Sequence, residues 1–349
     1  MPVPGPLGAD AGVVGRYVAR VQNEPAWLDC RVEVISGGRS NLTYTVISSA
    51  GELVLRRPPL LAVRPTAHDM VREYRVLTAL AGTAVPVPAT VHLCTDPDVL
   101  GAPFYLMERV TGVIARGALP PGYAEGPAER AAVAHGLLDV LADLHAVPPA
   151  EVGLADFGRP DGYRERQVRR WVGEWEALRD QDRPELDRLA ADLATAVPDG
   201  PSGSIVHGDY RLDNVVLHPD RPDQVRAVLD WEMSTLGDPL ADLGLLLVYW
   251  RQGTDDPLGG VAVPSATTLP GFPSRRQVAD RYAGRTGRDI STLPWYVAFG
   301  FFKLAVVVVG ILARQRAGAM TGDVASGMAA TIDGLAAGGR RALDTGDVE

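Results

Sequence analysis

The sequence predicts an α+β protein with a β-rich N-terminal part and a helix-rich C-terminal part. Short apolar-rich runs between positions 31 and 107 are typical of strands. Longer runs with helical periodicity follow from position 127. With 349 residues, of which 46% are hydrophobic, the chain can bury a substantial core in one large or two medium domains.

Two helices and about five strands are expected in the N-terminal part. Helices are predicted over 9–22 and 66–80; in the second, Met70, Tyr74, Leu77 and Leu80 share one face. Strands are predicted at 31–35, 42–47, 52–57, 91–94 and 103–107, with a turn at 96–98.

The C-terminal part is expected to be mostly helical. Helices are predicted over 127–146, 185–196, 240–249, 274–286 and 322–337, with a strand at 204–206, a long loop at 251–273 and a polar tail at 340–349. The apolar run 295–313 approaches the length of about 20 residues that spans a membrane. Because Lys303 lies at its middle, we predict a buried core helix and no membrane insertion.

Composition limits the partners and the compartment. A net charge of −9 and a pI near 5.2 argue against nucleic acid as the main partner. Cys30 and Cys94 have no metal-binding spacing, so we expect free buried thiols and a reducing, cytoplasmic compartment. The first ten residues lack the pattern of a signal peptide. The oligomeric state is left open.

One polar motif points to phosphoryl transfer. His207-Gly208-Asp209 precedes Asn214, and a short apolar run then ends at Asp230. A catalytic base followed by two magnesium ligands has this order. Phosphoryl transfer needs Mg²⁺ on the phosphates and an acceptor hydroxyl held in line. We therefore predict Asp209 as the group that accepts or orients the acceptor proton, and Asn214 and Asp230 as metal ligands.

The motifs resemble the aminoglycoside phosphotransferase-like family of small-molecule kinases. The resemblance rests on 207–214, on Leu229-Asp230-Trp231-Glu232, and on 237–243. It implies a two-lobed protein-kinase-like fold with a nucleotide-binding N-lobe at 1–110 and a catalytic, acceptor-binding C-lobe at 111–349. It also implies that Asp238 and Asp242 brace the catalytic loop.

Further stretches resemble one branch of this family. Residues 37–41, 55–59 and 101–108 are similar to the branch that also occurs as the N-terminal domain of acyl-CoA dehydrogenase family members ten and eleven. The resemblance spans roughly residues 30 to 315. We expect no dehydrogenase activity, because no region remains for a flavin-binding domain.

The resemblance implies a nucleotide site in the N-lobe. A glycine-bearing hairpin lets backbone N–H groups approach phosphates. Its candidate residues are Gly37, Gly38, Ser40 and Asn41. Kinase-like enzymes usually carry a lysine on the later strand 52–57, but Lys303 is the only lysine in this chain. Arg56 is therefore the candidate phosphate ligand, with Arg57 the alternative if the register shifts by one residue.

Three further positions complete the predicted nucleotide site. Glu73 on the helix 66–80 is expected to pair with Arg56. Met107 is expected to form an apolar roof, and main-chain groups from Glu108 to Val110 are expected to hydrogen-bond the adenine edge. Because backbone groups would make these bonds, the choice between ATP and GTP is left open.

We therefore predict an ATP-dependent phosphotransferase that uses Mg²⁺ and moves the γ-phosphoryl group to a hydroxyl of a small molecule. A hydroxyacyl-CoA-like acceptor is favoured by the branch resemblance and by the arginine-rich segment 159–170, which is equally compatible with a solvated helix face. An aminoglycoside acceptor is favoured only by the net acidity. A nucleotide-binding pseudokinase or regulatory module is the alternative from another class, because the usual lysine is missing.

Overall fold

The computed structural model describes residues 6–35, 41–60, 69–179, 181–200, 202–255, 265–316 and 325–349. It divides into two compact units. Unit 1 comprises Met1–Gly112 and Arg226–Ser234, and unit 2 comprises Val113–Val225 and Thr235–Glu349. Unit 1 therefore includes residues 226–234, whereas the predicted boundary at 110/111 assigned them to the C-lobe.

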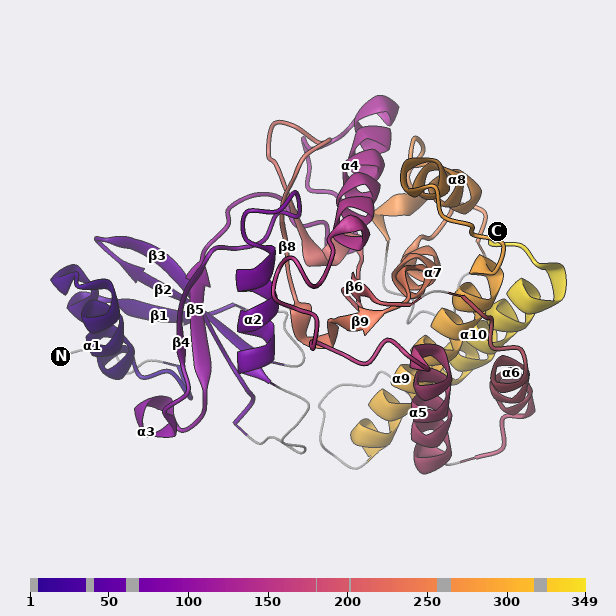
Figure 1. Cartoon of the computed structure of the whole chain (residues 1–349), viewed down its shortest axis with the longest axis horizontal. Coiled ribbons are helices and arrows are strands. Elements are labelled where there is room, and N and C mark those ends of the chain that lie inside the picture. The colour runs from indigo at the N-terminus through magenta and orange to yellow at the C-terminus, as the bar shows by residue number, and fades with distance from the viewer. Residues whose placement is uncertain are drawn as a thin grey trace. The chain divides into compact units, whose positions relative to one another are not determined.

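Unit 1 is built on one five-stranded antiparallel sheet (Figure 1). Its strands are β1 (Arg31–Val34), β2 (Leu42–Ser48), β3 (Gly51–Arg57), β4 (Thr90–Cys94) and β5 (Phe104–Glu108). They lie in the order β1-β2-β3-β5-β4. Each predicted strand ends within one residue of the observed one, so the predicted small sheet is confirmed.

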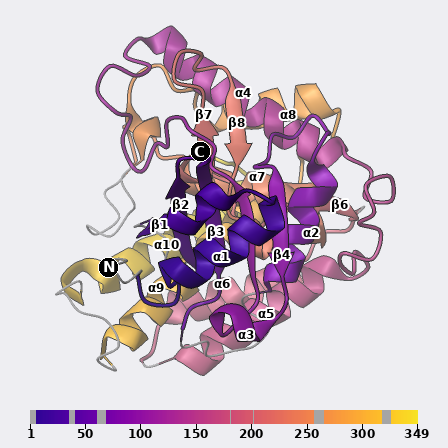
Figure 2. The ribbon, with the colours of Figure 1, turned by 90° about the vertical axis from the view of Figure 1, so that its left-hand side faces the viewer.

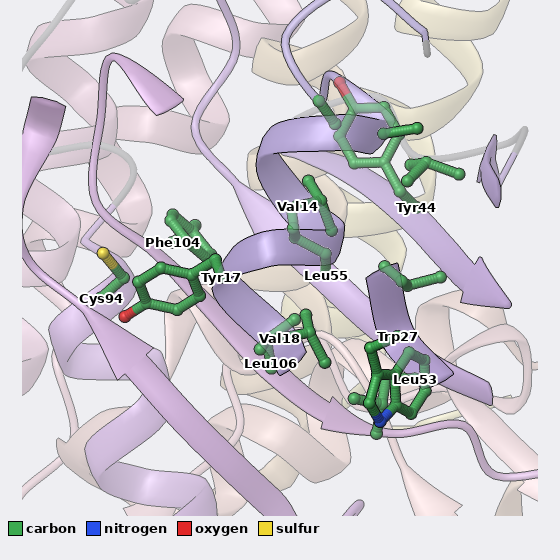
Figure 3. Close-up of a cluster of buried hydrophobic side chains, with 14 residues drawn as sticks. Val14, Tyr17, Val18, Trp27, Tyr44, Leu53, Leu55, Cys94, Phe104 and Leu106 are labelled. Atoms are coloured by element: carbon green, nitrogen blue, oxygen red, sulfur yellow. The ribbon is translucent and has the colours of Figure 1, made fainter. Parts of the chain in front are cut away.

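The two faces of this sheet have different roles. Helix α1 (Ala11–Gln22) packs over one face, where Val14 and Val18 join a core cluster with Leu53 and Leu55 of β3 (Figures 2 and 3). Because consecutive side chains of a strand alternate, Arg56 points to the opposite face. Helix α2 (Met70–Leu80) packs against β4 and β5.

Short helices interrupt the connections of unit 1. The predicted turn at 96–98 is instead the beginning of helix α3 (Pro97–Leu100), because Asp96 accepts a hydrogen bond from the Asp98 N–H at 2.9 Å and Pro97 occupies the first helical position. Two 3₁₀ helices, η1 (Pro25–Asp29) and η3 (Trp231–Met233), also belong to this unit. Strand β8 (Val225–Val228) leads into η3.

Unit 2 is mostly helical. Its helices are α4 (Pro127–Ala146), α5 (Tyr163–Leu178), α6 (Pro184–Thr195), α7 (Pro239–Tyr249), α8 (Arg275–Thr286), α9 (Leu293–Arg316) and α10 (Ala325–Thr345). Short elements complete it: β6 (Ser204–Val206), which pairs antiparallel with β9 (Thr235–Gly237), β7 (Val215–Leu217), η2 (Leu212–Asn214) and η4 (Ala266–Thr268). The sheet of unit 1 followed by these helices confirms the predicted α+β class.

Helix α9 is the central helix of unit 2. It packs against α5, α6, α7 and α10. Among the described residues, Leu293–Gln315 is the one helical stretch long and apolar enough to cross a membrane, and 67% of its most apolar window is buried inside the protein. This burial supports the predicted core helix.

The C-terminus differs from the prediction. Residues 340–345 continue helix α10 and do not form part of a polar tail. Arg340 Nη2 lies 3.1 Å from Asp344 Oδ1, one helical turn later, and such pairs stabilise the end of a helix.

Candidate active site

Arg56 lies at the centre of an ion-pair cluster in unit 1. Its Nε lies 2.8 Å from Glu73 Oε2, and its Nη2 pairs with Asp230 Oδ1. Glu232 Oε2 lies 3.7 Å from the same Nη2. Among the described residues, one guanidinium thus lies near three carboxylates, and we call this group the Arg56 cluster. The pairing with Glu73 is the contact that the sequence predicted.

Both carboxylate oxygens of Glu73 are engaged. Oε1 accepts a hydrogen bond from Asn41 Nδ2 at 2.8 Å, and Oε2 accepts one from the Tyr105 hydroxyl at 2.9 Å. Asn41 also donates to Glu232 Oε2 at 3.0 Å. The glutamate therefore holds two side chains beside Arg56.

Electrostatics keep this arginine charged. Burial alone would lower the pKa of Arg56, but the carboxylates of Glu73 and Asp230 raise it above its usual value. Burial raises the pKa of Glu73, and the guanidinium opposes that rise. Arg56 is therefore a fixed positive charge on this face of the sheet.

Arg57 points away from the cluster. Its Nη1 donates to the carbonyl of Leu100 at 2.9 Å and to that of Gly8, and its Nε donates to Pro58 at 3.2 Å. These partners lie on the α1 side of β3, as strand alternation requires. Arg57 is thus excluded as the partner of Glu73, and Arg56 remains the candidate phosphate ligand.

A tight turn presents Asp230 to the cluster. Its φ of 66° lies in the left-handed region, which aspartate adopts more readily than most residues. The Trp231 indole N–H donates to the Val228 carbonyl at 3.0 Å, and the Val228 N–H donates to Pro86 at 2.8 Å. These bonds fix the chain on both sides of the carboxylate.

Only some of the other candidate residues of the nucleotide site lie within the described part of the chain. Gly37, Gly38 and Ser40 lie outside the described residues. Met107 is buried in β5, and the Glu108 N–H already donates to the Ala89 carbonyl at 2.8 Å. The Glu108 N–H is therefore already hydrogen-bonded within the protein. Hydrogen bonds from this segment to adenine would have to come from other main-chain groups up to Val110, and these bonds remain a prediction.

The predicted catalytic turn follows β6 in unit 2. Gly208 has a φ of 87°, which favours glycine. The N–H groups of His207 and Gly208 donate to Oδ2 and Oδ1 of Asp242, each at 2.7 Å. His207 Nδ1 accepts the N–H of Asp209 at 3.2 Å. Asp242 therefore braces the turn, as predicted.

Asp242 is itself held by a buried histidine. His145 Nε2 lies 3.2 Å from Asp242 Oδ2, and its Nδ1 lies 2.7 Å from the Tyr282 hydroxyl. Burial alone would raise the pKa of Asp242, but the hydrogen bond and charge of His145, with the charge and backbone N–H of His207, lower it. The brace is an ionised carboxylate in the interior of unit 2.

Asp209 contacts the predicted metal ligand Asn214. Asn214 Nδ2 donates to Asp209 Oδ2 at 2.9 Å and to its main-chain oxygen at 2.8 Å. Arg211 Nε lies 3.3 Å from the same Oδ2, and its guanidinium lies 4.8 Å from the ring centroid of Tyr249. Because the Asn214 amide nitrogen faces Asp209, its amide oxygen is the atom suited to bind a cation.

Asp238 has a different structural role from Asp242. Its Oδ1 caps α7 by accepting the Leu240 N–H at 2.9 Å. Its Oδ2 accepts the Tyr296 hydroxyl at 2.6 Å and Arg164 Nε at 2.7 Å. Asp238 thereby joins α7 to α5 and α9, and its described bonds do not reach the catalytic turn.

Comparison with known proteins places the chain in a family. A model described as "Phosphotransferase enzyme family" matches residues 31–276. The chain belongs to the phosphotransferase enzyme family. This establishes the family resemblance predicted from the sequence.

Curated relatives share its sequence over most of its length. It is 36% identical to mouse acyl-CoA dehydrogenase family member 10 over 80% of this chain and 26% of that protein. It is 35% identical to rat acyl-CoA dehydrogenase family member 11 over 88% of this chain and 40% of that protein. The chain thus spans about a quarter to two-fifths of the length of these relatives.

Solved structures confirm the kinase-like fold. A putative aminoglycoside phosphotransferase from Ralstonia eutropha is 34% identical, with a TM-score of 0.79 over 96% of this chain and 98% of that one. A ternary complex of aminoglycoside phosphotransferase APH(4)-Ia with AMP-PNP and hygromycin B is 15% identical, with a TM-score of 0.60 over 95% of this chain and 98% of that one. The second likeness concerns the fold alone.

The residues that the sequence assigned to magnesium have the right chemistry. Asp230 offers a carboxylate and Asn214 an amide oxygen, and Mg²⁺ prefers such oxygen donors. The donor set therefore fits the ion.

Sequence reasoning missed two partners of the candidate residues. Tyr105, which donates to Glu73, is the cross-strand neighbour of Arg56, and only the strand register shows this. Arg211, which contacts Asp209, follows the motif by two residues, but its orientation depends on Tyr249 of α7. The spacing of the motifs predicted neither of these two contacts.

Proposed function

We propose that this protein transfers the γ-phosphoryl group of ATP to a hydroxyl of a small molecule. The observation that carries the proposal is the braced turn, in which Asp242 and His207 fix the backbone while Asn214 contacts Asp209. Membership of the phosphotransferase family supports the same reaction. ATP is favoured as the nucleotide because a solved structure of this fold holds AMP-PNP.

In the proposed reaction, Asp209 accepts the proton of the acceptor hydroxyl. The acceptor oxygen forms a bond to the γ-phosphorus, the bond from that phosphorus to the bridging oxygen breaks, and ADP leaves with the electron pair. Arg56 binds the α- and β-phosphates through its planar guanidinium. Asn214 and Asp230 would hold Mg²⁺, which when bound neutralises phosphate charge.

The acceptor that we favour is a hydroxyacyl-CoA-like metabolite. The support is the similarity to acyl-CoA dehydrogenase family members 10 and 11. An aminoglycoside is the second candidate, because the Ralstonia eutropha structure carries that description. A nucleotide-binding pseudokinase is the third, motivated by Arg56 at the position where kinase-like enzymes carry lysine.

We also propose a cytoplasmic location. Cys30 and Cys94 are both free, which suits a reducing compartment. Cell fractionation of the tagged protein tests this, and recovery in a membrane or secreted fraction would contradict it.

The reaction is tested by ADP formation from Mg·ATP over a panel of hydroxyacyl-CoAs, aminoglycosides and simple alcohols. We expect acceptor-dependent ADP formation that Asp209→Asn lowers about 10²- to 10⁴-fold, the usual effect of losing a general base. Mg·ATP binding, measured by calorimetry, should remain nearly unchanged. The control is Asp213→Asn, because Asp213 pairs with Arg211 and has no role in the proposed proton transfer. Equal turnover in wild type and Asp209→Asn would remove Asp209 from the mechanism.

A further inference from the structure

The only lysine of the chain lies in an aromatic and cationic cluster of unit 2. Lys303, at the middle of α9, has its Nζ 5.4 Å from the ring centroid of Trp171 on α5 and 5.9 Å from that of Phe299. The Arg170 guanidinium carbon lies 5.8 Å from the same Trp171 centroid. These residues form what we call the Trp171 cluster, in which one indole ring is shared by two cations.

Two donors of this cluster have no acceptor within the part of the chain that the structure describes. No carboxylate there lies within ion-pair distance of the Lys303 ammonium, and the Trp171 indole N–H is buried without a hydrogen-bond partner. Burial lowers the pKa of Lys303, and the carboxylates of Asp209 and Asp242 oppose that change. Lys303 is partly buried, and a buried N–H without an acceptor is unfavourable, so an anion bound between them would pair with both donors.

The acids near the predicted base are already paired. Asp209 accepts from Asn214 and lies beside Arg211, and Asp242 accepts two backbone N–H groups. Asp238 binds Arg164. Each of these acids therefore already has another donor, although the whole chain is acidic.

The Trp171 cluster and the turn that carries Asp209 both belong to unit 2. Arg164 on α5 and Tyr296 on α9 both bind Asp238, which caps α7. Asp242, on the first turn of α7, braces the turn that carries Asp209. Lys303 follows Tyr296 by about two helical turns. Helices α5, α7 and α9 thus fix the cluster relative to Asp209.

We propose that the Trp171 cluster binds an anionic group, a carboxylate or a phosphate, of the molecule that is phosphorylated. The proposal rests on the proposed function and names its substrate class: a hydroxyl compound that also carries negative charge. Lys303 and Arg170 supply charge, and the Trp171 N–H supplies a directed hydrogen bond. A polyamine sugar would meet repulsion from the same cations.

Binding of three matched probes tests this class without requiring turnover. The probes are 3-hydroxyoctanoate, its neutral methyl ester and the cationic 1-aminooctan-3-ol, each titrated by calorimetry into the full chain. We expect the anion to bind about tenfold more tightly than the ester, as charge-assisted hydrogen bonding predicts. Lys303→Met should abolish this preference and leave ester binding unchanged, and Lys303→Arg should retain it.

Arg169→Met is the matched control, because Arg169 is exposed on the same helix and outside the cluster. Its probe preference should equal that of the wild type. Absence of an anion preference in the wild type, or the same preference in Lys303→Met with an unchanged circular dichroism spectrum, would overturn the assignment.

Turnover of the same probes separates this inference from the proposed function. An anion preference that depends on Lys303, without phosphoryl transfer to any acceptor, would preserve the anion site and contradict the kinase reaction. Transfer to all three probes with equal kcat/KM in wild type and Lys303→Met would support the reaction and contradict the anion site.

Discussion

At the scale of single residues, the replacement of lysine by arginine has a structural explanation. Arg56 contacts Glu73 through Nε and Asp230 through Nη2, so two nitrogen atoms of its guanidinium pair with two different acids. A lysine ammonium is one compact charge on a flexible stem. The arginine therefore keeps the charge that a phosphate ligand requires and also fixes both acids.

Arg56→Met should weaken Mg·ATP binding by about tenfold or more, because it removes the positive charge of the proposed phosphate ligand. Arg56→Lys should bind Mg·ATP with intermediate affinity, since lysine restores the positive charge but lacks the planar guanidinium. Calorimetry with Mg·ATP measures both. Arg57→Met is the control: it removes bonds on the α1 side of β3, so it should lower stability without changing nucleotide affinity. The reverse pattern would exclude Arg56 from the nucleotide site.

Asp242→Asn should destabilise the protein by about 1–3 kcal/mol at pH 7, because the ionised acceptor of the buried His207 N–H and the partly buried Gly208 N–H is lost. The folded protein lowers the pKa of Asp242 below its unfolded value near 3.9. Its contribution is therefore present above about pH 4 and lost as pH falls through the lower folded pKa.

Denaturant unfolding at several pH values between 3 and 7 measures this contribution, with the variant expected to lose less stability than the wild type at the acid end. Exposed Asp220→Asn is the control and should follow the wild-type curve. A variant with wild-type stability at pH 7 would contradict the bracing role.

At the scale of elements, periodicity predicted the long helices and the strands well. Helix α4 begins and ends at the predicted residues 127 and 146, because its apolar pattern is continuous. Helix α5 had no such signal: among its apolar side chains, only Val168 and Trp175 are fully buried, and arginines dominate the rest. The short helix α3 depends on its N-cap Asp96. The sequence-based prediction of a turn did not take this local hydrogen bond into account.

Close packing of α7 on α9 gives a prediction at this scale. A Cβ at Gly244 would lie 2.6 Å from the backbone carbon of Tyr296, so Gly244→Ala should destabilise the protein by about 1–3 kcal/mol. In Gly173→Ala, at an exposed position of α5, the new Cβ meets no atom within 4 Å, so the protein should become more stable by up to about 1 kcal/mol. Denaturant unfolding of both variants measures the contrast, and equal effects would contradict the packing described for α7 and α9.

At the scale of the whole molecule, the candidate chemistry is divided between two units. Asp209 and Asn214 belong to unit 2, whereas Asp230 lies in a short segment that belongs to unit 1 with Arg56 and Glu73. Motif order identified these residues, but it carried no information on which compact unit takes up residues 226–234. That assignment depends on contacts such as the bond from Val228 to Pro86, which are distant in sequence.

Nucleotide binding should stabilise the whole chain. At 100 times the dissociation constant, a ligand that binds only the folded state adds about 2.7 kcal/mol. Mg·ATP should therefore raise Tm, and EDTA should reverse most of the rise if Mg²⁺ is bound at Asn214 and Asp230. Differential scanning calorimetry measures this. Asp230→Asn should show a smaller rise than Asp213→Asn, and equal rises would exclude Asp230 as a metal ligand.

The most direct test of the central claim is ³¹P NMR of the reaction with Mg·ATP and each acceptor of the panel. The proposed reaction predicts one new phosphomonoester for each ADP with the wild-type protein, and neither product at a comparable rate with Asp209→Asn. ADP accompanied only by inorganic phosphate, or equal phosphomonoester formation by the variant, would contradict the proposal.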